Sequence, residues 1–145
     1  MSGKGSTYAD DLLKLIFNAT AIANIADNAS ASPLTTLYVS LHSADPGPAG
    51  NQTTSEVAYT GYARIGVART AGGFTVSGTA VSFVAAVVFG TCTGGTATAT
   101  FFAIGTASSG AGKLLYTGPV TPNITITSSM PSPPQLLAAS GGTES

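Results

Sequence analysis

Hydrophobic and polar residues along this chain follow two different periods, one typical of a helix and one typical of strands. Near the N-terminus, apolar residues recur at the spacing i, i+4, i+7 and i+8, so they line one helical face: Tyr8, Leu12, Leu15 and Ile16. Thr7 precedes this run and Asp10 lies three residues further on, which is close to a capping box. The pattern predicts a helix over about residues 8–18. Residues 19–33 are compatible with either an extension of this helix or a loop.

After Pro33 the period changes to two, which is typical of half-buried strands. In residues 37–42, one set of alternating positions is apolar: Leu37, Val39 and Leu41. The clearest alternation covers residues 96–104 and predicts a common face for Thr98, Thr100, Phe102 and Ile104. Another strand is predicted over residues 62–70. Shorter strand-like runs occupy residues 74–76, 79–83, 85–89, 114–117 and 124–127.

Gly- and Pro-rich turn signals separate these runs at intervals of about 8–12 residues. Such a series predicts an all-β protein, a jelly-roll-like antiparallel β-sandwich with one N-terminal helix. No helical patterns alternate with the strands, which argues against a parallel α/β fold. Residues 7–127 are expected to form this single domain. Residues 1–6 are expected to be a flexible N-terminal arm, and residues 128–145 a Ser/Pro-rich C-terminal tail that can dock on a partner.

The composition narrows the range of functions. Only 8% of the 145 residues are charged and the net charge is -1, whereas about a quarter of the residues are charged in ordinary soluble domains. Copies of such a protein repel one another only weakly, which is typical of a subunit of a larger assembly. The five Lys and Arg residues are scattered, so no basic stripe for nucleic acid is expected. No apolar run is long enough to span a membrane.

The residues that could carry chemistry are few, and we predict no catalytic, cofactor-binding or metal-binding site. His42 is the only histidine, and a zinc site built on it would have Cys92 as its sole further His or Cys ligand. No Gly-x-Ser-x-Gly elbow supplies a nucleophile. We therefore interpret His42 as a hydrogen-bonded loop residue that holds the turn at Asp45–Gly47, and Cys92 as a small buried side chain. A lectin-like module or a divergent hydrolase built around His42 is a remaining alternative.

A glycine-rich segment, Ser109–Leu114, has some features of a phosphate-binding loop. The position where that motif requires its first glycine is Ala107, and Lys113 is followed by Leu114 instead of a hydroxyl-bearing residue. Strand-like runs flank the segment on both sides. It is therefore predicted to be a hairpin turn.

Three segments resemble a known protein family. They are residues 37–47 (LYVSLHSADPG), 54–64 (TSEVAYTGYAR) and 102–116 (FAIGTASSGAGKLLY). These segments are similar to small virion proteins of tailed bacteriophages, which are often labelled tail fibre proteins. Some members resemble capsid cement or decoration proteins with a jelly-roll fold. The resemblance implies a structural protein present in many identical copies, and it offers no catalytic residues to transfer.

The resemblance and the low charge together predict a capsid cement (decoration) protein and not an enzyme. In this hypothesis the protein is made in the host cytoplasm and then binds the outside of the major capsid protein shell, which it stabilises, as a homodimer. Neither nucleic acid, membrane nor any cofactor is an expected partner. The alternative is a tail fibre, collar or receptor-binding component. In the cement hypothesis, residues 1–6, 43–58 and 128–145 are expected to contact partners, whereas the alternative predicts aromatic residues exposed at one tip.

Overall fold

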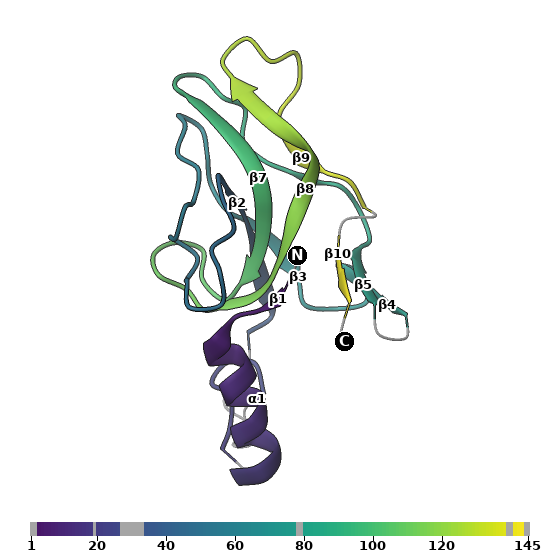
Figure 1. Ribbon diagram of the computed structural model, residues 1–145. Helices are drawn as coiled ribbons and strands as arrows, with labels where there is room; N and C mark the ends of the chain where they lie inside the picture. Colours follow the sequence, from purple (N-terminus) through teal and green to yellow (C-terminus); the bar gives the residue numbers. More distant parts are fainter. Residues whose placement is uncertain (1–2, 19, 27–33, 78–79, 139–140, 144–145) are drawn as a thin grey trace.

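The computed structural model describes residues 3–18, 20–26, 34–77, 80–138 and 141–143 (Figure 1). Within these residues there is one helix, α1 (Ser6–Asn18). The strands are β1 (Gly3–Lys4), β2 (Thr36–His42), β3 (Ile65–Ala68), β4 (Phe74–Ser77), β5 (Ala80–Phe83), β6 (Val87–Val88), β7 (Thr96–Gly105), β8 (Leu114–Thr127), β9 (Gln135–Leu136) and β10 (Gly141–Thr143). All strand pairs are antiparallel. The predicted all-β class with one N-terminal helix is confirmed.

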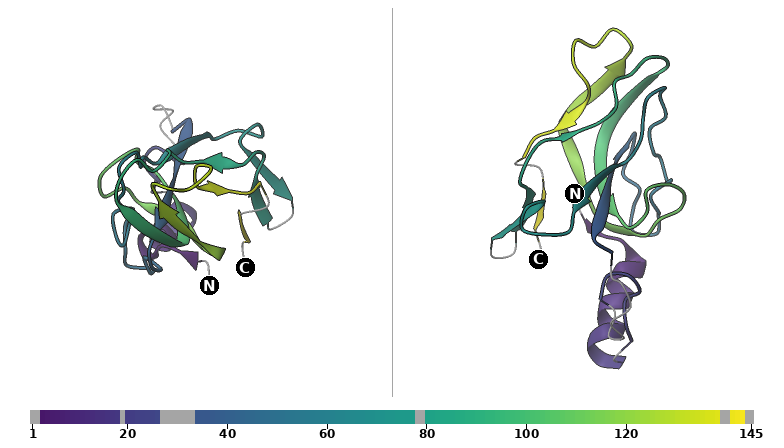
Figure 2. Two further views of the ribbon diagram at one scale, coloured as in Figure 1. Left: turned by 90° about the horizontal axis from the view of Figure 1, so that it is seen from above. Right: turned by 180° about the vertical axis from the view of Figure 1, so that it is seen from behind.

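The strands form one large sheet and two small ones. The large sheet has the order β1-β8-β7-β2-β3, and the small sheets are β10-β5-β4 and β6-β9. One apolar core joins them, because Leu41 of β2 and Phe102 of β7 belong to the same buried cluster as Phe83 of β5 and Leu136 of β9. The small sheets therefore cover one face of the large sheet, which makes the body a β-sandwich (Figure 2).

Strand β7 departs from the simple alternation that the sequence predicts. The pairing with β8 is irregular between Ala99 and Phe101, because Ala99 pairs with Ile124 and Phe101 with Pro119, so that residues 120–123 of β8 lie opposite Thr100 alone. At such an irregularity the strict alternation of side chains is interrupted, so later positions need not keep the face of earlier ones. The core receives Ala99 before this irregular point and Phe102 and Ile104 after it. The predicted common face for Thr98, Thr100, Phe102 and Ile104 is wrong for this reason.

Both chain ends, where they are described, pair with strands of the body. Of the predicted arm over residues 1–6, Gly3 and Lys4 form β1 and pair with β8. Of the predicted tail over residues 128–145, β9 pairs with β6 and β10 with β5. Each of these segments supplies backbone N–H and C=O groups to a strand edge that would otherwise need water as its partner.

Helix α1 extends away from the lower end of the β body (Figure 1). Its first turns are attached by an edge-to-face contact between the rings of Tyr8 and Tyr116, with centroids 5.7 Å apart, and by an ion pair between Asp11 and Lys113. The helix ends at Asn18, and residues 20–26 form a tight turn with a bridge between Ile22 and Ala26. This turn is no extension of the helix. Residues 19 and 27–33, the rest of the undecided segment, lie outside the described residues.

Candidate functional site

The polar side chains that are most deeply buried gather where the long connection between β2 and β3 meets the hairpin between β7 and β8. Arg64 is at the centre and is only 8% exposed. Its guanidinium pairs with both carboxylate oxygens of Glu56, through Nε at 2.7 Å and Nη2 at 2.8 Å. It also donates to the carbonyl oxygens of Ala107 at 2.9 Å and Gly110 at 2.8 Å. One side chain thus ties the β2–β3 connection to the hairpin.

The electrostatics of this ion pair favour the charged forms. The hydrogen bonds that Arg64 donates to the Glu56 carboxylate raise the pKa of Arg64 above its usual value, so the arginine stays charged. The Tyr62 hydroxyl donates to Glu56 Oε1 at 2.8 Å and accepts from the backbone N–H of Leu41 at 3.2 Å. Burial raises the pKa of Tyr62 far above its usual range. Tyr62 therefore acts as a neutral hydrogen-bond bridge between β2 and Glu56.

Gln52 fills the remaining space between the connection and the hairpin. Its side chain is fully buried, donates to the carbonyl of Tyr38 at 3.3 Å and accepts from the backbone N–H of Ala107 at 2.9 Å. A Cβ at either Gly105 or Gly112 would overlap the Gln52 amide. Glycine at these two positions therefore leaves the room that the Gln52 side chain needs.

His42 belongs to the same buried region and has both ring nitrogens occupied. Nδ1 lies 2.8 Å from the carbonyl oxygen of Thr54, so Nδ1 carries the proton and donates. Nε2 then accepts from the hydroxyl of Ser40 at 2.9 Å. Because a carbonyl is present where a catalytic triad would have a carboxylate, and because Ser40 and His42 are both fully buried, this pair is not accessible to a substrate.

The predicted role of His42 needs one correction. His42 holds the segment around Thr54, whereas the turn at residues 45–47 is closed by Asp45 itself, whose carboxylate accepts from the backbone N–H of Gly47 at 2.9 Å. This is the turn that Asp commonly makes by bonding its own backbone two residues on.

Cys92 is buried, as expected, with Sγ 3.5 Å from the carbonyl oxygens of Gly94 and Gly95.

We call the residues that link the β2–β3 connection to the body the polar clamp; they are Ser40, His42, Gln52, Glu56, Tyr62 and Arg64. Gln52, Glu56 and Arg64 could not be identified as site residues from periodicity, since no periodic pattern marks residues in a loop. The available signal was that Glu56 and Arg64 fall inside one of the segments that carry the family resemblance. Ser109–Gly112 lie in the β7–β8 hairpin, where the carbonyl of Gly110 accepts from Arg64.

Because the clamp holds residues 43–58 against the body, only some of these residues remain exposed for contact with a partner. Among these residues, Gln52 and Val57 are buried and Pro46 also packs inward, while Ala44, Asp45 and Ala49 are exposed. The connection is therefore a fixed part of the body that still presents exposed positions. Its contribution to partner contacts stays a prediction.

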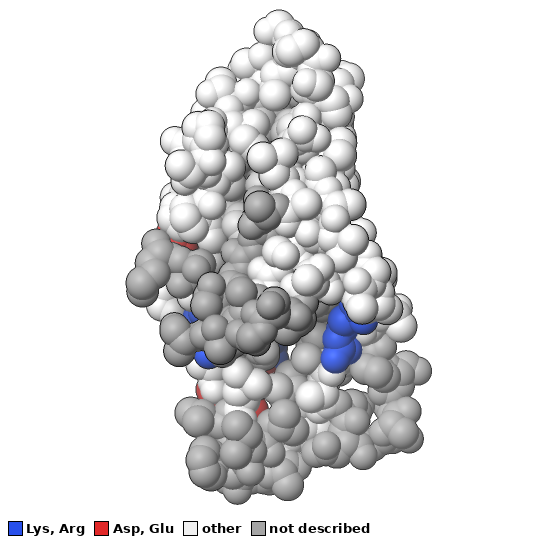
Figure 3. Space-filling view, turned by 90° about the vertical axis from the view of Figure 1, so that its right-hand side faces the viewer, with Lys and Arg blue, Asp and Glu red and all other residues white. Residues whose placement is uncertain are grey.

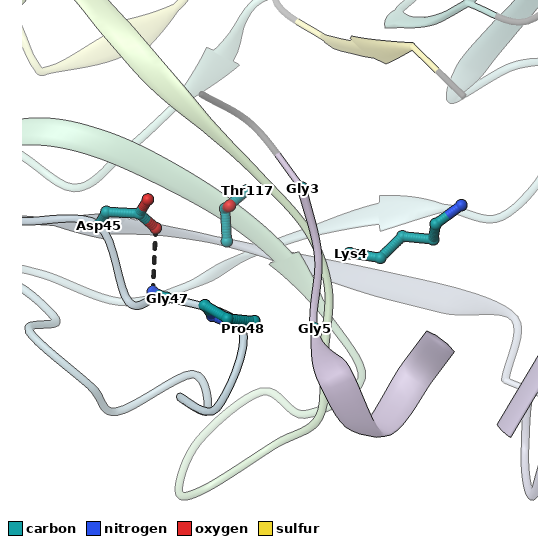
Figure 4. Close-up of a pocket in the computed structure, with 7 residues that line it drawn as sticks. All are labelled: Gly3, Lys4, Gly5, Asp45, Gly47, Pro48 and Thr117. Atoms are coloured by element: carbon teal, nitrogen blue, oxygen red, sulfur yellow. Dashed lines mark hydrogen bonds between the residues drawn. The ribbon is translucent and has the colours of Figure 1, made fainter. Parts of the chain in front are cut away.

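Several hollows on the surface of the described residues are large enough to consider as binding sites. The first, of about 300 Å³, lies between β1 and the turn at residues 45–48 (Figure 4). Glycine backbone forms much of its wall, the Asp45 carboxylate is engaged with Gly47, and the Lys4 side chain extends away from Asp45. The second is an apolar groove of about 640 Å³ between β8 and residues 130–137.

Two absences concern only the part of the chain that the structure describes. It contains no group of three or more His, Cys, Asp or Glu residues that could hold a metal ion. It also contains no helix with the length and apolar character needed to cross a membrane.

Comparison with known proteins assigns the family. Residues 9–131 match the family model described as Podophage GP4 fiber I protein gp80, and the search of curated proteins gives no match. The three segments that carry the resemblance, and every residue of the polar clamp, fall within the matched range. The chain therefore belongs to the Podophage GP4 fiber I protein gp80 family and is a structural virion protein of the tailed-phage type.

Proposed function

We propose that this protein is a structural subunit of a phage fibre, in which a rigid β body spaces and connects neighbouring virion proteins. The observation that carries the proposal is the match of residues 9–131 to a fibre-protein family. The geometry supports it, because the body has a helix extending from one end and uncharged loops at the other (Figure 1). Such a shape can contact different neighbours at its two ends.

The polar clamp supports a load-bearing role. It joins two segments that are distant in sequence by hydrogen bonds, several of which involve charged groups and are therefore stronger than neutral ones. Since a connection held in this way has few alternative conformations, force applied at one end can be transmitted through the sheet. The fully buried Ser40–His42 pair serves this stiffness and offers no reaction centre to a substrate.

The capsid cement role, as a homodimer on the outside of the major capsid protein shell, is the second candidate. It is favoured by the low charge, which lets a surface lie against many neighbours without unpaired charges. The family description favours the fibre role over the cement role. A receptor-binding or collar position is a variant of the fibre proposal.

Copy number in purified particles separates the two candidates. Quantitative mass spectrometry, with the major capsid protein as internal standard, should find this chain in a small number of copies set by the symmetry of a tail. A particle image with a bound antibody fragment should then place it on the tail. Hundreds of copies over the shell would favour the cement role, and absence from the particles would reject both.

A further inference from the structure

Charged residues are distributed very unevenly in this chain. Between Thr70 and Thr143 the only charged residue is Lys113, and its ammonium pairs with Asp11 of helix α1. The space-filling view shows no charged atom over the upper part of one face, and the charged atoms that are visible lie lower down, towards the helix (Figure 3). In a chain with so few charges, the pairing of this lysine with the helix indicates that charge holds the helix to the body.

Helix α1 contacts the strands through a small number of side chains. The Asp11 and Lys113 side chains of the ion pair are 26% and 32% exposed, so water and salt reach them. Beside this pair, the rings of Tyr8 and Tyr116 make a single edge-to-face contact, and both residues are only half-buried. The helix is therefore attached by one partly exposed ion pair and one ring contact, without a broad apolar interface in the described part of the chain.

Arg69 forms a second polar attachment, on the segment that returns from the helix. Its guanidinium donates to the carbonyl oxygens of Ile25 at 2.6 Å and Leu34 at 2.9 Å. Its backbone N–H donates to the carbonyl oxygen of Thr35 at 2.8 Å. One exposed side chain thus ties the turn that follows the helix to the start of β2. We call α1 and residues 20–26 the helical lobe.

The helical lobe does not share the apolar core of the sheets. Among the residues whose side chains are described, the core cluster and the apolar residues packed against it begin at Leu37. Ile22 of the lobe is only 2% exposed, yet it is not part of this cluster. Movement of the lobe would therefore leave the packing between the sheets intact.

Gly5 provides a pivot for such movement. It is the single residue between β1 and α1, and the close-up shows it where the strand passes into the helix (Figure 4). The chain before it is fixed, because β1 pairs with β8. A Cβ at Gly5 would lie 2.9 Å from the carbonyl oxygen of Leu114, so glycine is needed where the chain passes so close to β8. Glycine also permits a wider range of backbone angles than other residues.

We infer that the helical lobe is hinged on the β body and is held in its present position by a charge-dependent latch, formed by Asp11, Lys113 and Arg69. Opening the latch turns the lobe about Gly5 and the segment before β2, while the sheets stay folded. Partly exposed ion pairs are weak and are screened by salt, so high ionic strength releases the lobe. This device lets a rigid body reach neighbours at more than one distance, and it applies to a fibre and to a capsid position alike.

Distances between spin labels on the full chain, measured by double electron–electron resonance, test the inference. Labels at Ala21→Cys in the lobe and Thr125→Cys on β8 occupy exposed positions, whereas the natural Cys92 is buried. At low salt a single distance should dominate. In about 1 M NaCl, where the Debye length falls to about 3 Å, the population at other distances should rise about two- to fivefold.

Three variants identify the charges responsible. Lys113→Met keeps most of the side-chain length without the charge; it should raise the population at other distances about two- to fivefold at low salt, and added salt should then have a smaller effect. Asp11→Lys should raise it further, because it places two like charges together. The matched control combines Asp11→Lys with Lys113→Asp, which restores opposite charges and should restore the dominant distance.

Amide hydrogen exchange of β7, measured under the same conditions, reports whether the body stays folded. Its protection should not change with salt or with Lys113→Met. A distance that neither salt nor Lys113→Met alters would overturn the inference, as would spread distances in the wild type at low salt. Loss of protection in β7, or a double variant that stays spread, would also overturn it. Copy number in particles tests the fibre proposal alone, so the two can fail separately.

Discussion

Two regions of this β body are stabilised in opposite ways. Around Arg64, a long connection is held by a buried ion pair and by hydrogen bonds from fully buried His42 and Gln52. Around the groove, strands β6 and β9 are held by apolar packing of Val87 and Leu136, with no charged residue nearby in the sequence. The first region uses directional bonds and the second uses burial of apolar area.

The comparison separates the region that fixes one conformation of the chain from the region that can adhere to another surface. A buried charge tolerates only the partners that satisfy it, so the clamp selects one conformation of the β2–β3 connection. An apolar surface without charge has no such demand and can be covered by any complementary surface. The clamp region therefore makes the subunit rigid, while the uncharged region remains free to associate.

The largest effect is expected from Arg64→Met in the clamp. The substitution leaves Glu56 as a largely buried carboxylate without its partner and removes the donors to Ala107 and Gly110. The free energy of unfolding should fall by about 3–5 kcal/mol in chemical denaturation. The control is Arg69→Met, an exposed arginine that donates to two backbone carbonyls, for which about 1 kcal/mol is expected. Equal losses for both variants would contradict the role of the clamp.

The next effect concerns the uncharged region. Leu136→Ala removes a core side chain that is only 3% exposed and should lower the free energy of unfolding by about 2–4 kcal/mol through the cavity it leaves. The adjacent Leu137→Ala provides the comparison, because that side chain points outward; measured in dilute protein, it should change stability by at most about 0.5 kcal/mol. A similar loss for both would show that the two neighbours do not face opposite sides.

A smaller effect is expected from Gly112→Ala. The new methyl group would overlap the Gln52 amide and the Cβ of Ala107, and because the Gln52 side chain is fully buried the clamp must shift, with a loss of about 1–3 kcal/mol. Gly72→Ala is the matched control, since its nearest atom would be Thr70 Oγ1 at 3.5 Å, an ordinary contact. Thermal denaturation of the two variants side by side gives the comparison. Unchanged stability of Gly112→Ala would mean that Gln52 is free to move.

The smallest effect is a dependence of stability on pH. Burial lowers the pKa of His42 below its ordinary value of 6.5, against the opposing influence of the Thr54 hydrogen bond and of Glu56 and Asp45; Arg64 lowers it further. The unfolded chain therefore binds a proton more readily than the folded one. The stabilisation should be complete above pH 6.5 and should decrease as the pH falls below that value.

Denaturant midpoints measured between about pH 7.5 and pH 5 check this dependence. The His42→Gln variant should be less stable at every pH, because it loses part of the bonding to Ser40 and Thr54, but its midpoint should vary less with pH across this range. The same decrease in both proteins would assign the pH dependence to other groups.

Part of the fold could be predicted from the pattern of residues alone. The alternation of Leu37, Val39 and Leu41 correctly indicates the face of β2 that meets the core, since a strand has a period of two wherever it is regular. The same rule fails in β7, because its pairing with β8 is irregular between Ala99 and Phe101 and the alternation of facing is interrupted there. The helix is predicted to within two residues of its observed start at Ser6.

The candidate site was much less predictable. Glu56 and Arg64 are eight positions apart in an irregular connection, and their carbonyl partners are in a hairpin more than forty positions further on. No local pattern relates such residues, since the contact exists only once the sheet has brought the two segments together. The buried state of Gln52 is equally invisible, because the space around it depends on the absence of side chains at Gly105 and Gly112.

The sequence by itself determined the class of the fold, the N-terminal helix and the scarcity of charge, because these follow from local periodicity and composition. Only the tertiary structure decided which polar residues became buried partners, where β7 changes its face, and that the uncharged segments meet around one groove. These features depend on contacts between residues that are far apart in the chain. A local pattern of residues carries no information about the energies of such contacts.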